Sequence, residues 1–299
     1  MTHEQAVGID LGGTKILAGV VTATGRILGQ VTLPTEAHKD AGTILSNMVR
    51  AAEGALQTAG LAWTDVEAVG VGSPAPLDIV KGLIISPGNL PSLHGFPLVA
   101  RLSAAVGRRV VLNNDANCYG LAEARYGVGT GARVCCGLTL GTGLGGFLVI
   151  GGELYNGPRG AATEIWCSPY QGDQVEEKVS GRGVSRNYKK LTERVATARE
   201  TAELARSGDA HAREAWREFG RDLAVPVAYL CNITDPDVVV LGGSMSKAWD
   251  LFGDAMLAEA MKYINAVTRD AVRIVPGALG DAAGMLGAAA LVLTRPPAP

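Results

Sequence analysis

Two glycine-rich segments, far apart in the chain, share a pattern that could bind phosphate. Residues 7–21 read VGIDLGGTKILAGVV, residues 136–150 read CGLTLGTGLGGFLVI, and the two align without gaps. Each is an apolar stretch, a turn of Gly and Thr, and a second apolar stretch, which is typical of strand–turn–strand. Glycines in such a turn let main-chain N–H groups approach an anion, and Thr or Lys adds further donors. Two such turns facing each other across a cleft would hold a polyphosphate.

Two aspartates stand where a strand is expected to end. Asp10 directly precedes the first glycine turn, where it could hold a magnesium ion through water while the turn binds phosphate. Asp115 follows Asn113 and Asn114 at the expected start of a helix. A helix start stabilises an ionised carboxylate, which suits a general base that takes a proton from an alcohol. The plainer interpretations are a turn aspartate bonded to its own backbone and an ordinary helix cap.

Alternating strand and helix patterns must position these residues. Apolar runs bounded by Gly, Pro, Asn or Asp indicate strands, and apolar residues at helical spacing indicate helices. Each half opens with a strand hairpin, so we predict a duplicated α/β fold with a cleft between two lobes. We expect Pro226 to kink or break its helix and the last five residues to be a frayed tail. The predicted strands are 7–11, 15–21, 26–33, 66–71, 109–112, 136–150 (with its turn) and 237–241; the predicted helices are 40–59, 98–106, a stretch ending at 124, 184–207, 211–231 and 282–293.

Composition excludes several classes of protein. The chain has 299 residues, enough for two domains, and a net charge of −2 without a basic block, which argues against nucleic acid or an anionic membrane as partner. The first residues lack a signal pattern and no apolar run reaches membrane-spanning length, so we expect a cytoplasmic protein. The cysteines suggest buried thiols rather than disulfides, and the four scattered histidines define no zinc cluster.

Taken in order, these motifs resemble those of the sugar kinases of the ROK family (repressor, open reading frame, kinase). That family lies within the actin, hexokinase and Hsp70 superfamily, and the resemblance covers nearly the whole chain. It implies a duplicated actin/hexokinase-like (ribonuclease H-like) α/β fold of two lobes with a central cleft. We expect a small lobe of residues 1–116 plus 286–299 and a large lobe of residues 117–285.

The resemblance also assigns roles to residues. Residues 10–15 look like the family's first phosphate motif and 140–146 like its second; 242–244 and 284–287 look like elements flanking the adenosine. The implied nucleotide-binding residues are Asp10, Gly12, Gly13, Thr14, Lys15, Thr142, Gly143, Gly243, Ser244 and Met285. Residues 72–78 resemble a wall of the sugar site, residues 87–90 resemble the P-N-L element, and the Asn–Asp pair matches the catalytic pair, making Asp115 the base. The implied sugar-binding residues are Asn89, Asn114, Asp115, Glu164 and Glu176.

The chain departs from the family at its zinc module. The family usually carries E-x-G-H, but this chain keeps Glu164 and has Trp166 and Cys167 in place of the Gly and His. The cysteine-rich zinc loop that follows in the family is missing, since residues 168–174 contain no cysteine. We therefore expect no zinc, a Trp166 that packs in the core rather than stacking on the sugar, and a Cys167 that is a small buried filler rather than a nucleophile. Residues 175–182 resemble the stretch that follows the zinc loop in the family, which would make Glu176 the second sugar-binding glutamate. The plainer interpretation is that Glu176 lies on a solvated helix face.

Together these features predict an ATP-dependent, Mg²⁺-requiring hexose kinase that phosphorylates the 6-hydroxyl of a sugar, with glucose as the first choice. Fructose, mannose, allose or an N-acetylated amino sugar are the alternatives, and polyphosphate stays open as a donor. A non-catalytic sugar sensor, as among the family's repressors, is disfavoured by the intact Asp115 and the lack of basic charge. The resemblance further suggests a homodimer.

Overall fold

The computed structural model describes residues 4–294, which form two compact units. Unit 1 contains residues 4–131, 152–162 and 279–294, and unit 2 contains residues 132–151 and 163–278. The lobes expected from the sequence divide the chain at other residues, 116/117 and 285/286, and stay a prediction. The expected frayed tail, 295–299, lies outside the described residues.

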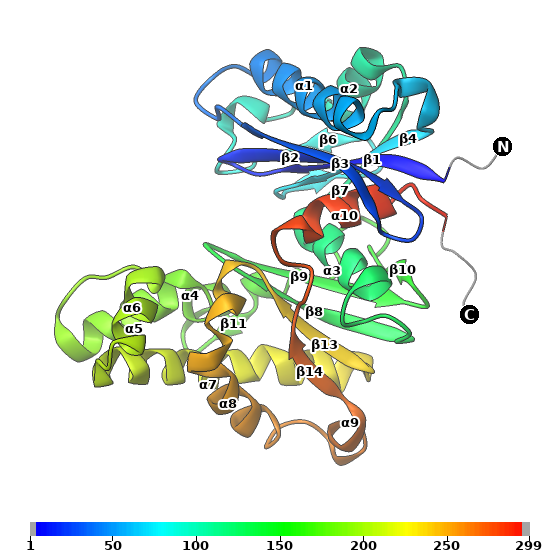
Figure 1. Cartoon of the computed structure of the whole chain (residues 1–299). Helices are drawn as coiled ribbons and strands as arrows, with labels where there is room; N and C mark the ends of the chain where they lie inside the picture. Colours follow the sequence, from blue (N-terminus) through cyan, green and yellow to red (C-terminus); the bar gives the residue numbers. More distant parts are fainter. Residues whose placement is uncertain (1–3, 295–299) are drawn as a thin grey trace. The chain divides into compact units, whose positions relative to one another are not determined.

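Unit 1 contains one main sheet with helices on both faces (Figure 1). The sheet order is β3-β2-β1-β4-β7, in which β1 pairs antiparallel with β2 and parallel with β4. Its elements are β1 (Gln5–Leu11), β2 (Lys15–Thr22), β3 (Ile27–Pro34), α1 (Ala41–Ala59), β4 (Ala68–Ser73), β5 (Leu77–Asp78), β6 (Leu83–Ile84), α2 (Leu98–Val106), β7 (Arg109–Asn114), α3 (Asp115–Tyr126), β10 (Glu153–Leu154) and α10 (Ala283–Ala290), with short 3-10 helices at 63–65, 91–93 and 280–282.

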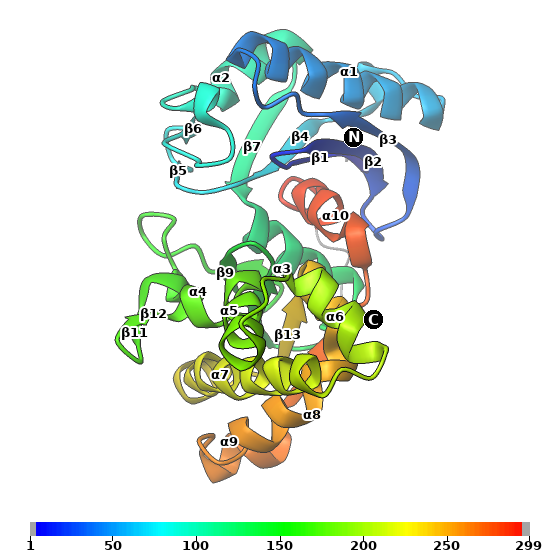
Figure 2. The same cartoon turned by 90° about the vertical axis from the view of Figure 1, so that its left-hand side faces the viewer.

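Unit 2 repeats this arrangement, with strands in the order β9-β8-β13-β14 (Figure 1). Figure 2 shows the helices α5, α6, α7 and α8 of this unit. Here β8 pairs antiparallel with β9 and parallel with β13, as β1 does with β2 and β4. The elements are β8 (Val134–Leu140), β9 (Leu144–Ile150), β11 (Pro169–Tyr170), β12 (Asp173–Gln174), α4 (Val175–Lys178), α5 (Gly181–Thr192), α6 (Ala198–Arg206), α7 (Ala210–Thr234), β13 (Val238–Gly242), α8 (Trp249–Ala260), α9 (Ala266–Ala271) and β14 (Arg273–Pro276), with 3-10 helices at 165–167 and 244–248. The matching strand orders confirm the predicted duplication.

The two hairpins differ by one residue from the gap-free alignment of their sequences. In the first hairpin Leu11 pairs with Ile16, so four residues lie between the paired ends. In the second hairpin Leu140 pairs with Leu144, so only three residues lie between them. The returning strand β9 is therefore shifted by one position relative to β2. Because side chains alternate between faces, a one-residue shift moves each side chain of that strand to the other face.

Each unit has its own apolar core. In unit 1, α1 and α2 cover one face of the sheet, and α10 with α3 forms a second apolar cluster with β1 and β2. The close approach of α10 requires glycine in the sheet, because a Cβ on Gly70 would lie 1.7 Å from the Ala288 carbonyl oxygen. In unit 2 a single cluster joins the strands to helices α4 to α8 and includes the stacked and edge-on rings of Trp216, Phe219 and Phe252.

Most predicted elements are confirmed, and the structure adds detail to two of them. The stretch 184–207 is two helices, α5 and α6, because Glu193 ends α5 in the left-handed conformation with φ of 62°. The expected break at Pro226 does not occur, since α7 runs through it to Thr234; the alternative expectation, a kink at Pro226, stays a prediction. Asp40 caps α1 by accepting a hydrogen bond from the Thr43 N–H at 3.0 Å. In the part of the chain that the structure describes, no helix is both long and apolar enough to cross a membrane.

Candidate active site

The first glycine turn is held in shape by a buried threonine. The Thr35 hydroxyl donates to the Gly12 carbonyl at 2.7 Å, and the Thr35 N–H donates to the Thr14 carbonyl at 3.0 Å. Inside the turn, the Gly12 N–H donates to the Lys15 carbonyl at 3.0 Å. Thr35 is fully buried. Sequence reasoning missed it, because a lone threonine just after a strand carries no signal of its own.

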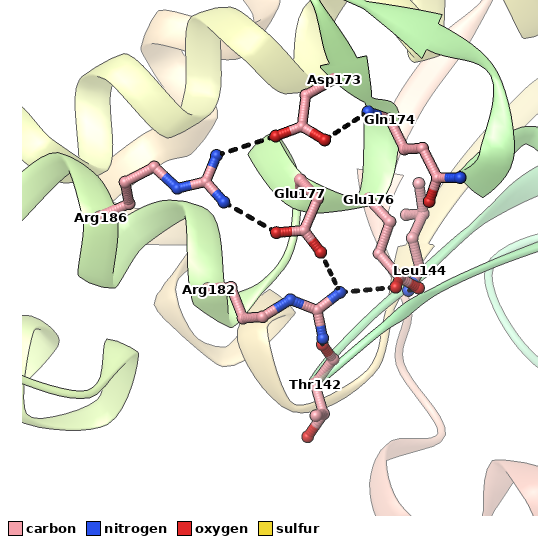
Figure 3. A network of polar contacts seen from close by, with 8 residues as sticks. All are labelled: Thr142, Leu144, Asp173, Gln174, Glu176, Glu177, Arg182 and Arg186. Atoms are coloured by element: carbon pink, nitrogen blue, oxygen red, sulfur yellow. Dashed lines mark hydrogen bonds and ion pairs between the residues drawn. The ribbon is translucent and has the colours of Figure 1, made fainter. Parts of the chain in front are cut away.

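The second glycine turn is held by residues 176–182, which run from α4 into the first turn of α5. The Gly181 N–H donates to the Gly141 carbonyl at 2.9 Å, and the Arg182 guanidinium donates to the Thr142 carbonyl at 3.3 Å. On the other side, the Leu144 N–H donates to the Glu176 carboxylate at 2.8 Å. Figure 3 shows Glu176 and Arg182 converging on this turn.

Both turns leave the same two N–H groups available. Among residues 4–294, the N–H groups of Gly13 and Thr14 in the first turn have no hydrogen-bond partner, and neither do those of Thr142 and Gly143 in the second. These positions correspond in the alignment of the two segments. Two adjacent unpartnered N–H groups on a glycine turn are a suitable site for a phosphate oxygen.

Asp10 lies at the end of β1, beside the first turn. A Cβ on Gly284 of α10 would lie 2.7 Å from the Asp10 carboxylate, so the helix start approaches the acid closely. Burial raises the pKa of Asp10 to about 6, although the charge of Lys15 opposes this. Within residues 4–294 the carboxylate accepts no hydrogen bond.

These surroundings fit a divalent cation near Asp10. A desolvated carboxylate without a hydrogen bond would be stabilised by a nearby positive charge, and Mg²⁺ prefers one or two carboxylates together with water and phosphate oxygens. No group of three His, Cys, Asp or Glu side chains that could hold a metal exists in the described residues. A cation at Asp10 would therefore share its coordination with bound phosphate rather than with a protein cage.

Strand pairing places Asp10 in one row with Asn113, the residue that directly precedes the Asn114–Asp115 pair. Asp10 is opposite Gly72 on β4, and Gly72 is opposite Asn113 on β7. All three are at the carboxyl ends of parallel strands, the edge at which open α/β sheets bind ligands. Asp115 follows as the first residue of α3 and is exposed, so a substrate can reach it.

The start of α3 is ordered by amide side chains. The Asn114 side chain accepts from the Ala116 N–H at 2.9 Å, which caps the helix. Asn113 accepts from the Asn117 side chain at 2.9 Å and donates to Asn156 at 3.0 Å. Asn156 lies in the glycine-rich segment after β10 and carries no motif, so the sequence did not reveal it.

The buried thiol of Cys118 is influenced by the charges of both Asp10 and Asp115. Cys118 on α3 is fully buried, and a Cβ on Gly72 would lie 3.1 Å from its sulfur. Burial raises the pKa of Cys118 far above its usual value, and the charges of Asp10 and Asp115 raise it further.

Asn89 and the two motifs predicted to flank the adenosine, residues 242–244 and 284–287, lie in different environments. The Asn89 amide lies against the first turn, 2.8 Å from where a Cβ on Gly13 would be. Gly243 has φ of 82°, and a Cβ on it would lie 2.3 Å from the Leu140 carbonyl oxygen, so β13 ends directly beside the second turn. Met285, by contrast, is fully buried in the core of unit 1. Its predicted nucleotide contact stays a prediction.

Glu164, Trp166 and Cys167, which the sequence singled out, lie together in unit 2. Glu164 is exposed, and its carboxylate accepts a hydrogen bond from the Trp166 indole. Trp166 packs against the unit 2 core, as expected. The expectation for Cys167 is wrong: it is exposed, since the short 3-10 helix 165–167 turns it outward. The other four cysteines are buried, as predicted.

Comparisons with known proteins agree with this arrangement. The profile of the ROK family matches residues 6–295. A glucokinase from Thermotoga maritima is 30% identical over 99% of both chains, and an N-acetyl-D-glucosamine kinase from Salmonella newport is 34% identical over 96% of this chain and 99% of its own. The crystal structure of a ROK family glucokinase from Streptomyces griseus, in complex with glucose and AMPPNP, is 30% identical over 96% of this chain and 98% of that chain, with a TM-score of 0.81.

The similarity spans both units and both glycine turns, and the expected duplicated α/β fold of the actin and hexokinase type is confirmed. The chain belongs to the ROK family.

Proposed function

We propose that this protein transfers the γ-phosphate of Mg-ATP to the 6-hydroxyl of a hexose, with glucose as the first candidate. The chain is a sugar kinase, in line with its relatives over nearly their whole length. The observation that carries the proposal is the pair of glycine turns, each with two unpartnered N–H groups at matching positions within the described residues. The relative from Streptomyces griseus, a glucokinase whose structure contains glucose and AMPPNP, supports ATP and glucose as the substrates.

In the proposed reaction Asp115 accepts the proton of the sugar hydroxyl as its oxygen attacks the γ-phosphorus. Asn89, Asn114, Glu164 and Glu176 bond the other hydroxyls. An analogue that lacks a hydroxyl would leave its partner side chain unpaired in the complex, so these contacts would select the sugar. The N–H groups of the two turns and Lys15 compensate the negative charge of the phosphates. Mg²⁺, with Asp10 beside it, would supply further charge compensation when bound.

In phosphoryl transfer the protein itself forms few or no covalent bonds. Catalysis therefore depends mainly on positioning the reactants and compensating their charge. This accounts for the way the site is built. The donors are main-chain groups on short turns whose carbonyls are already bonded elsewhere, so they need little rearrangement when phosphate binds.

N-acetyl-D-glucosamine is the second candidate acceptor, because the Salmonella newport relative with that activity in its name is 34% identical. Fructose, mannose and allose follow. A panel of these hexoses with Mg-ATP, read by ADP release, ranks the acceptors, and polyphosphate in place of ATP tests the donor. Activity that survives a zinc-selective chelator would agree with the predicted absence of zinc. Failure to release ADP with any sugar would contradict the kinase proposal and favour a sugar sensor.

Asp115→Asn tests the proposed base. We expect turnover to fall by about 10²- to 10⁴-fold, because general-base catalysis contributes that much, while the sugar still binds in calorimetry. Asp40→Asn is the matched control: it makes the same carboxylate-to-amide change at the N-terminus of α1, where Asn also caps well. Near-normal turnover of Asp115→Asn would remove Asp115 from its role.

A further inference from the structure

Two arginines on α5 belong to one ion-pair network with the acids of β12 and α4, but only one of them reaches the second glycine turn (Figure 3). Arg182 pairs with Glu176 at 2.6 Å and with Glu177 at 2.8 Å. Arg186 pairs with Glu177 at 2.7 Å and with Asp173 at 3.4 Å. The two arginine side chains are about equally exposed, at 44% and 45%.

The inner pair bonds the turn from both sides. Arg182 donates to the Thr142 carbonyl while its partner Glu176 accepts from the Leu144 N–H. The residue between those two, Gly143, is close to the same carboxylate, since a Cβ on it would lie 2.7 Å from a Glu176 oxygen. One ion pair thus brackets the two unpartnered N–H groups of the turn.

We propose that Arg182 is a positioning residue for the phosphoryl donor: with Glu176 it clamps the Thr142–Leu144 turn so that the N–H groups of Thr142 and Gly143 point at phosphate. The inference rests on the proposed function, in that the donor is a phosphate compound bound at this turn. It adds a residue, and a mechanism for ordering the turn, that the predicted set of site residues did not contain.

The physical need for a clamp follows from the turn itself. Two of the three residues between the paired Leu140 and Leu144, namely Gly141 and Gly143, are glycines, which lose more conformational freedom on ordering than other residues do. In the first turn the fully buried Thr35 supplies this ordering. The second turn has no buried equivalent among the described contacts; its side-chain restraints are the partly exposed Arg182 and Glu176.

The guanidinium fork is essential to this role. It contacts the Glu176 and Glu177 carboxylates and the Thr142 carbonyl at once, whereas a lysine ammonium is a single point charge that cannot reproduce the planar arrangement. Partly exposed ion pairs contribute little to global stability. Loss of Arg182 should therefore disturb the turn without unfolding the protein.

The experiment compares Arg182→Gln, Arg182→Lys and the matched control Arg186→Gln on the full chain. We expect Arg182→Gln to raise the KM for ATP about 10-fold, because a lost ground-state contact to the donor appears in KM, and Arg182→Lys to recover only a small part of this loss. Arg186→Gln should stay within about 2-fold of wild type, since Arg186 does not touch the turn.

A second readout does not depend on turnover. Hydrogen exchange of the Leu144 amide, which is bonded to Glu176, should speed up in Arg182→Gln and stay unchanged in Arg186→Gln. Calorimetric binding of AMPPNP, a non-hydrolysable ATP analogue, should weaken in the same order as the KM for ATP rises.

The outcomes are distinct. Wild-type-like ATP KM and Leu144 exchange in Arg182→Gln would overturn the inference, and so would an effect confined to the KM for the hexose. Equal losses in Arg182→Gln and Arg186→Gln would also overturn it, because the turn contact would then be irrelevant. If wild type shows no kinase activity, the proposed function fails, yet AMPPNP binding and exchange still test the clamp.

Discussion

Replacing Asp10 with Asn should stabilise the ligand-free protein while impairing it as an enzyme. Burial raises the pKa of Asp10 from 3.8 to about 6, and a shift of one pKa unit corresponds to about 1.4 kcal/mol. The ionised carboxylate therefore destabilises the folded state by about 3 kcal/mol at pH 7.5. Asp10→Asn removes this charge, so we expect the free energy of unfolding to rise by up to that amount.

The pH dependence of this effect has a definite sign. Because the pKa of Asp10 is higher in the folded state, the folded protein binds more protons between pH 3.8 and about 6, and wild-type stability falls as pH rises through that window. The stability gained by Asp10→Asn should be complete at pH 7.5 and about half as large at pH 5. Urea unfolding of both proteins at the two pH values, followed by circular dichroism without nucleotide or Mg²⁺, measures it.

The same variant should bind Mg-ATP poorly. Ligand that binds only the folded state stabilises it, so Mg-ATP should raise the unfolding midpoint of wild type more than that of Asp10→Asn. The control is Asp40→Asn: hydrogen bonds from Thr43 lower the pKa of Asp40, so this variant should gain no stability as pH rises. If Asp10→Asn is less stable than wild type at pH 7.5, or its effect is the same at pH 5, the argument from desolvation is refuted.

Three further variants probe other parts of the site. Thr35→Val keeps the shape of a buried residue but removes the hydroxyl that holds the first turn. The free energy of unfolding in urea should fall by about 1–2 kcal/mol, and the KM for ATP should rise. An unchanged KM for ATP would show that the turn does not need this hydrogen bond. Trp166→Phe removes the indole N–H that bonds Glu164; we expect the KM for the hexose to rise several-fold with the KM for ATP unchanged, and the reverse pattern would contradict a sugar role for Glu164. Gly243→Ala places a Cβ 2.3 Å from the Leu140 carbonyl at φ of 82° and should lower stability by about 2 kcal/mol or more; wild-type stability in thermal unfolding would mean that β13 and the turn can separate freely.

Several site contacts could not be predicted, because they join residues distant in sequence that carry no local pattern. Arg182 and Glu176 lie in a charge-rich run that looks like an ordinary solvated helix face, and only the fold brings that run against the second turn. Asn156 lies 43 residues beyond Asn113, in a segment that is notable only for its glycines. Exposure was equally hard to infer: Cys167 was expected inside because free cysteines usually are, but the chain geometry at 165–167 places it outside.

The amino-acid sequence by itself determined the two strand–turn–strand hairpins, the alternation of strands and helices, the duplication and the family, because periodicity, glycine turns and motif order are local properties of the chain. The tertiary structure alone decided which distant groups hold each turn, that the returning strand of the second hairpin is shifted by one residue, and that Asp10 is a desolvated acid. These depend on packing between segments far apart in sequence, where close contact and the loss of water set hydrogen bonds and charge.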